Sequence, residues 1–193
     1  MHTKLTYENH SLNPHIGRLG LFWDVEKLVP GTRPLLWKAI EKCRYGWHHP
    51  ISIEWQAGFL ILDSCGNQRQ LTAGSYSSET GTRILGPFGC ELNSQITLIQ
   101  ERPRPDLSFA ICRNGQPLAK FPLGMVGSWS LTMPDQLKMQ IECRAKVAQP
   151  ITDPEATVFS LNGMRSFNIA LCGGAPGPCS TPLRLVSYGA IAT

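Results

Sequence analysis

Two cysteines and two adjacent histidines have the donor atoms that a metal ion needs. Cys43, His48, His49 and Cys65 carry the nitrogen and sulfur ligands that Zn²⁺ binds in a tetrahedron. Zinc ligands usually come as closely spaced pairs, but the sequence contains neither C-x-x-C nor H-x-x-x-H. Cys43 also falls on the apolar stripe of a predicted helix. We therefore favour a core cysteine and surface histidines, with no metal and no cofactor.

Cysteine nucleophiles are a second kind of chemistry to consider. A thiolate needs a neighbouring base, so Cys43 or Cys90 would need a histidine such as His48 or His49 beside it in the fold. Buried cysteines are mostly inert, so we expect no catalytic cysteine. The seven cysteines are odd in number and widely spaced, which favours a reducing intracellular compartment, cytoplasm or virion, over secretion. Motifs of serine hydrolases, P-loop NTPases and dinucleotide-binding enzymes are absent.

The stretch Gly20–Glu26 places an aspartate after a short apolar run. Its sequence, Gly-Leu-Phe-Trp-Asp-Val-Glu, followed by Val29-Pro30-Gly31, resembles the opening motif of NYN-type ribonucleases over about the first quarter of the chain. The resemblance implies that Asp24 ends a parallel strand and holds a divalent ion for RNA cleavage. The alternative, which we favour, is a short strand and turn with a surface carboxylate.

Basic residues recur in two parts of the second half of the chain. Arg102 and Arg104 alternate with prolines, whereas Lys138, Arg144 and Lys146 lie on or just after the polar face of one predicted strand. Such residues could dock an anionic lipid surface or a nucleoprotein. The alternative is a solvated strand face.

Tryptophans concentrate in the first third of the sequence. Core packing is the usual reason for buried tryptophans, and exposed ones such as Trp23 or Trp47 would mark a protein-binding surface. A tryptophan-rich protein-binding module is therefore a further alternative for the function. The five tryptophans are Trp23, Trp37, Trp47, Trp55 and Trp129.

The front of the chain predicts an arm, a strand and a helix. Residues 1–19 are polar and predict an irregular N-terminal arm, and residues 19–25 predict a short strand. Thr32 is a plausible N-cap for a helix over residues 32–45, with Gly46 as its stop. The apolar stripe of that helix consists of Leu36, Ala39, Ile40 and Cys43.

The remainder of the chain predicts short strands. Asn114-Gly115 between Leu107–Cys112 and Pro117–Phe121 predicts a hairpin with a type I′ turn. Apolar and polar residues alternate between Ser128 and Arg144, which predicts two joined strands with one buried face. We expect a long loop with weak strands over residues 63–90. Other strands are expected over residues 51–55, 59–62, 95–100, 167–171 and 183–188.

Length and composition fit a β-rich globular domain. The chain has 193 residues, of which 42% are hydrophobic, and a net charge of +4. We predict a mainly β (α+β) fold, an antiparallel β-sandwich or strongly curved sheet over residues 20–193 with one N-terminal helix packed on it; a barrel is the alternative. No apolar run approaches the roughly 20 residues of a membrane span.

These observations favour a non-enzymatic structural or assembly protein. The expected partners are further copies of the chain and an anionic lipid surface or nucleoprotein, as in viral matrix or capsid-associated proteins. The metal-dependent ribonuclease built around Asp24 remains the enzymatic alternative.

Overall fold

The described chain is built almost entirely from β-strands. The structure is a computed structural model that describes residues 2–13, 16, 18–26, 28, 32–41, 44–87, 94–151, 155–175 and 181–192. These residues form sixteen strands in four sheets of four strands each, with 61% of the chain in strands and no helix. The prediction of a mainly β fold is confirmed.

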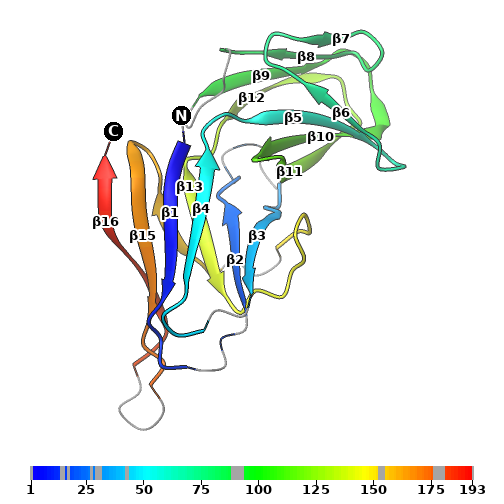
Figure 1. Ribbon diagram of the computed structural model, residues 1–193. Helices are drawn as coiled ribbons and strands as arrows, with labels where there is room; N and C mark the ends of the chain where they lie inside the picture. Colours follow the sequence, from blue (N-terminus) through cyan, green and yellow to red (C-terminus); the bar gives the residue numbers. More distant parts are fainter. Residues whose placement is uncertain are drawn as a thin grey trace.

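Strands from the two ends of the described chain form one sandwich, which we call the terminal sandwich (Figure 1). One sheet has the order β16-β15-β1-β4 and the other has the order β14-β13-β2-β3. Their inner faces share one apolar core, and the rings of Phe159 in β14 and Phe167 in β15 lie 6.5 Å apart across it. The strands are β1 (His2–Asn9), β2 (Arg18–Trp23), β3 (Leu36–Glu41), β4 (His48–Glu54), β13 (Gln136–Ile141), β14 (Thr157–Ser160), β15 (Met164–Cys172) and β16 (Arg184–Ala192).

The middle of the chain forms a second set of sheets, the central sandwich, in the upper part of Figure 1. Its sheets have the orders β11-β10-β5-β6 and β12-β9-β8-β7. Phe59 and Phe109 stack in its core with ring centroids 5.9 Å apart. The strands are β5 (Gly58–Asp63), β6 (Gln68–Leu71), β7 (Tyr76–Ser77), β8 (Thr82–Leu85), β9 (Gln95–Gln100), β10 (Arg104–Arg113), β11 (Gln116–Leu123) and β12 (Gly127–Thr132).

The chain passes between the two sandwiches twice, through residues 55–57 and residues 133–135. Arg113, at the end of β10, lies at this junction and is only 1% exposed. Its guanidinium donates hydrogen bonds to the carbonyls of Glu54 (3.0 Å) and Trp55 (2.8 Å) at the first connection and of Pro134 (3.4 Å) at the second. One side chain of the central sandwich therefore binds both connections to the terminal sandwich.

Two buried tryptophans complete the environment of Arg113. The guanidinium carbon lies 4.5 Å from the ring centroid of Trp23, and the indole of Trp37 donates a 2.9 Å hydrogen bond to the Arg113 carbonyl. The two indoles meet edge to face at 5.7 Å. Burial lowers the pKa of Arg113 to about 10, so the side chain keeps its charge at neutral pH.

The hairpin that carries Arg113 has the predicted turn. Asn114 and Gly115 both have positive φ angles, 52° and 72°, as a type I′ turn requires. The Asn114 side chain accepts a hydrogen bond from the Glu54 amide and donates one to the Ser52 carbonyl, both 3.1 Å long. The turn residues thus also dock the hairpin onto β4.

The predicted helix over residues 32–45 is wrong, because the described part of this segment contains β3. A register shift opposite Leu21 and Phe22 accompanies a bulge at Trp37. Trp37 and Ile40 face the main core, whereas Leu36 and Ala39 contact a smaller cluster on the opposite face. A bulged strand with two buried faces therefore gave apolar residues a spacing similar to that of a helix.

Two other local expectations differ from the structure. The expected irregular arm over residues 1–19 begins with β1, which lies between β4 and β15. The sequence of β1 is mostly polar because Leu5 and Tyr7 alternate with polar residues, and because the buried Thr3 and Asn9 are polar as well. The alternating segment from Ser128 to Arg144 does form two strands, but β12 pairs with β9 and β13 pairs with β2 and β14.

Replacement of Arg113 by methionine is expected to lower the free energy of unfolding by about 3–5 kcal/mol, because buried carbonyls at both connections lose their donor. Urea unfolding monitored by tryptophan fluorescence measures the loss. The control Arg144→Met removes an exposed guanidinium and is expected to change stability by about 0.5 kcal/mol at most. Similar values for the two variants would contradict the role of Arg113.

Candidate functional site

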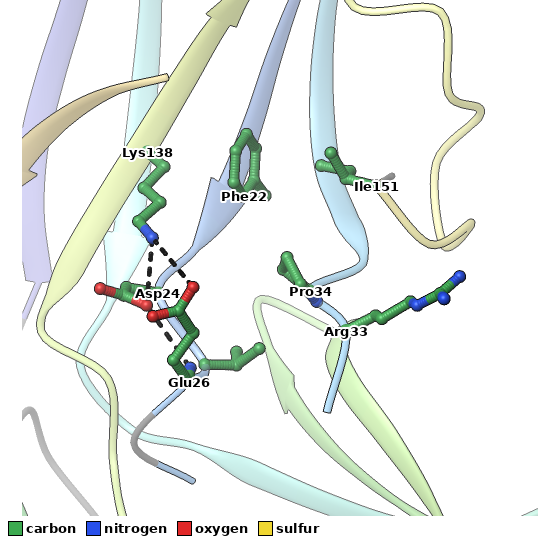
Figure 2. A pocket seen from close by; sticks show the side chains of 8 residues that line it. Phe22, Asp24, Glu26, Arg33, Pro34, Lys138 and Ile151 are labelled. Atoms are coloured by element: carbon green, nitrogen blue, oxygen red, sulfur yellow. Dashed lines mark hydrogen bonds and ion pairs between the residues drawn. The ribbon is translucent and has the colours of Figure 1, made fainter. Parts of the chain in front are cut away.

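A pocket of about 230 Å³ opens beside Asp24 in the terminal sandwich (Figure 2). β2 brings Phe22 to its wall and ends just before Asp24, while β13 places Lys138 directly opposite Phe22 in the register. The pocket is apolar on the side of Phe22 and Ile151 and charged on the side of Asp24, Glu26 and Lys138. Its lining consists of Phe22, Asp24, Val25, Glu26, Arg33, Pro34, Lys138 and Ile151.

The charged groups of this pocket neutralise one another. The Lys138 ammonium lies 3.2 Å from a carboxylate oxygen of Asp24 and 4.0 Å from one of Glu26. The side chains of Lys138 and Asp24 are 15% and 16% exposed, so their pair is largely shielded from water. Arg33 extends away from the two carboxylates in Figure 2. The arrangement fixes the chain after β2 against β13.

The geometry around Asp24 differs from what the ribonuclease resemblance implies. β2 is antiparallel to both of its neighbours, β3 and β13, so Asp24 does not end a strand of a parallel sheet. The Asp24 carboxylate faces the ammonium group of Lys138. A site for a divalent metal ion would instead need further oxygen ligands around that carboxylate. Within the described ranges, His, Cys, Asp and Glu residues form no group of three or more that could hold a metal ion.

The structure assembles a second polar cluster, which the sequence did not reveal, on the outer face of the sheet β16-β15-β1-β4. Glu8 of β1 is at its centre, with His10 Nε2 at 2.8 Å from one carboxylate oxygen and His48 Nδ1 at 3.3 Å from the other. The Tyr188 hydroxyl of β16 also donates a hydrogen bond to Glu8. Glu8 pairs with Ala170 of β15 and Tyr188 pairs with Asn168 of the same strand, so β15 lies between the two partners.

The hydrogen bonds shift the pKa values of both partners. The bond from Tyr188, followed by that from His10, lowers the pKa of Glu8, and nearby His48 acts in the same direction. The same bond and the negative charge of Glu8 raise the pKa of Tyr188 to about 12. Tyr188 therefore stays neutral and tethers β16 to β1 over a wide pH range.

Aromatic side chains extend this cluster on the surface. Trp47 is 48% exposed and Tyr45 is 67% exposed. The ring of Trp47 lies 5.9 Å from that of His49, and Tyr45 meets His10 edge to face at 6.5 Å. Trp47 is thus accessible to a partner, as the prediction of a binding role for this residue requires. Trp23 is fully buried beneath Arg113 and belongs to the core.

The five basic residues that the sequence suggests for docking an anionic partner belong to two different sandwiches. Arg102 and Arg104 belong to the central sandwich, whereas Lys138, Arg144 and Lys146 lie in or just after β13 of the terminal sandwich. Arg104 donates two hydrogen bonds to the carboxylate of Asp106, at 2.9 and 2.7 Å, and Lys138 pairs with Asp24. Two of the five charges are therefore neutralised within the protein.

The described residues among the candidate zinc ligands do not converge on one site. His48 contacts Glu8, and His49 packs near Tyr7 and Trp47. Cys65 is exposed in the turn between β5 and β6. Cys43, like the nucleophile candidate Cys90, lies outside the described residues.

Comparison of the chain with protein-family models, with curated proteins and with solved structures gave no match. The described residues include no helix long and apolar enough to cross a membrane.

Asp24→Asn is expected to lower the free energy of unfolding by about 1–2 kcal/mol, because a partly shielded ion pair lies between exposed and fully buried pairs in its contribution. Chemical denaturation checks this value. Glu26→Gln is the matched control, since Glu26 is 75% exposed and 4.0 Å from the same ammonium. An equal loss in both variants would contradict a specific role for Asp24.

The lowered pKa of Glu8 predicts a pH-dependent contribution to stability. The charged carboxylate stabilises the fold above its unfolded pKa of about 4.3, and the contribution is lost as the pH falls through the lower folded pKa. Urea unfolding of the wild type and Glu8→Gln should therefore differ at pH 7, and the difference should disappear once the pH falls below the lowered folded pKa of Glu8. A difference that is independent of pH would refute this assignment.

Proposed function

We propose that the protein is a non-enzymatic assembly protein that associates with itself through the outer edge of β16. The observation that carries this proposal is the composition of that edge. From Leu185 to Ala192 the strand has no charged residue and no proline. No described strand pairs with its outer side. An unpaired strand of this kind is a template for another strand.

The other long edges carry protection that β16 lacks. β4, at the opposite edge of the same sheet, contains Pro50 and the exposed Glu54. β11 contains two prolines and Lys120. The edge of β3 is covered, because Leu36 exchanges two backbone hydrogen bonds with the segment at Ala148 and Gln149. β12 is uncharged but has only six residues, compared with nine in β16.

Side chains next to the edge support an interface. Ile191 is 60% exposed and Tyr188 is 41% exposed, so pairing would also bury apolar surface. Gly189, with a φ of 60°, introduces a bulge near the C-terminal end of β16, whereas the register from Arg184 to Tyr188 is regular. The hydrogen bond from Tyr188 to Glu8 holds this regular part on the sheet.

A second copy of the chain is the partner that this edge fits most directly. Two β16 strands related by a two-fold axis would pair antiparallel and join two four-stranded sheets into one of eight. The dispersed basic residues add no support for an anionic docking surface, so we do not include one in this function. A viral matrix or capsid-associated role remains a prediction from the sequence.

Size-exclusion chromatography with light scattering tests the proposal. The wild type is expected to shift from monomer to dimer as its concentration rises, and Ile191→Lys to remain monomeric, because a charge on the edge would be buried by pairing. Val158→Lys is the matched control, since Val158 is 48% exposed on β14, another edge strand. A wild type that stays monomeric up to millimolar concentration, or equal effects of both lysines, would refute it.

A further inference from the structure

A polar cleft of about 330 Å³ lies where the two sandwiches meet. No residue of β16 is among the lining residues that the structure describes. The cleft is bounded by the end of β4, the connection through residues 55–57, strands β5 and β6, and the Asn114-Gly115 turn. Its volume falls in the range of small-molecule sites, and junctions between structural units are common places for such sites.

Amide side chains dominate the polar lining of this cleft. Gln56, Gln68 and Gln70 border it, and in the described part of the chain none of these three amides has a hydrogen-bond partner. Asn114 differs, because its amide is engaged with β4 and holds the turn in place. The glutamines therefore offer unused donors and acceptors on one surface.

Charge in the cleft is limited to one carboxylate. Glu54 is exposed at the end of β4, and its carboxylate forms no ion pair with any described residue. No lysine, arginine or histidine is among the lining residues that the structure describes. A phosphorylated or sulfated ligand would find no counter-charge, whereas a ligand rich in hydroxyl groups would meet acceptors and donors.

The glycine that begins β5 keeps the floor of the cleft open. Gly58 pairs with Cys112 of β10 and has no positive φ that would require glycine. A Cβ atom built there would meet only the Cβ of Cys112, at an ordinary contact distance of 3.8 Å. Because Gly58 has no side chain, this part of the floor stays open to the cleft.

We propose that this cleft binds a neutral oligosaccharide. Each amide group both donates and accepts hydrogen bonds, as each sugar hydroxyl does, and a carboxylate such as that of Glu54 can accept bonds from two neighbouring hydroxyls. Leu60, the register partner of Gln70, and Cys112, the partner of Gly58, provide an apolar base on the same face of the sheet. Burial raises the pKa of Cys112 to about 11, so its thiol stays neutral beneath the ligand.

An array of immobilised oligosaccharides tests this inference with the intact protein; it carries neutral members built from hexoses, N-acetylhexosamines and pentoses, together with sulfated members. The expected result is binding to at least one member, followed in solution by NMR shifts of the Gln68 and Gln70 amides. Gln70→Ala and Gly58→Val should weaken that binding at least tenfold, the first by removing hydrogen bonds and the second by filling the floor.

Gln95→Ala is the matched control, because Gln95 is an exposed glutamine on β9, outside the cleft. It should bind like the wild type. No binding to any neutral glycan, preference for sulfated glycans on the same array, or unchanged binding by Gln70→Ala would overturn the proposal. Because Gln70 is exposed on an edge strand, its substitution leaves folding intact even if Gly58→Val does not. Ile191→Lys should bind glycan normally, which separates this site from self-association.

Discussion

The guanidinium of Arg113 is the interaction on which the arrangement of the two sandwiches depends. The central sandwich is connected to the terminal one by two short segments, and this one side chain binds carbonyls of both. Trp23 and Trp37 surround it and place its charge against an aromatic face. A buried cation with three carbonyl acceptors is costly to disturb, because each acceptor would lose its partner away from water. The junction is therefore fixed in one geometry.

Both proposed interaction surfaces depend on that junction or on the sheet beside it. The polar cleft has walls from the end of β4 and from the β10–β11 hairpin, so its shape requires that Asn114 and Arg113 stay docked. The edge of β16 belongs to the sheet that contains β4, and Tyr188 links it to β1 through Glu8. Assembly and ligand binding would thus use separate faces of one rigid framework.

The sequence revealed features that local chemistry determines. Asn114-Gly115 predicted its hairpin because only residues that tolerate positive φ form that turn, and β9 was expected at its observed bounds. The helix prediction failed at Trp37, where a bulge and two buried faces reproduce helical spacing. The cluster around Glu8 was hidden because its members come from three strands whose pairing depends on the whole fold. The cleft was hidden for the same reason, because its lining residues come from separate strands that only the complete fold brings together.

Native-state hydrogen exchange is the most direct measurement of the coupling between the sandwiches. If Arg113 joins them into one unit, the slowest amides of β2 and those of β10 should exchange through a single global opening, with the same free energy and the same dependence on denaturant. Exchange of β10 through an opening that costs at least about 2 kcal/mol less than that of β2, and that exposes less surface, would show that the central sandwich unfolds alone. That result would contradict the account.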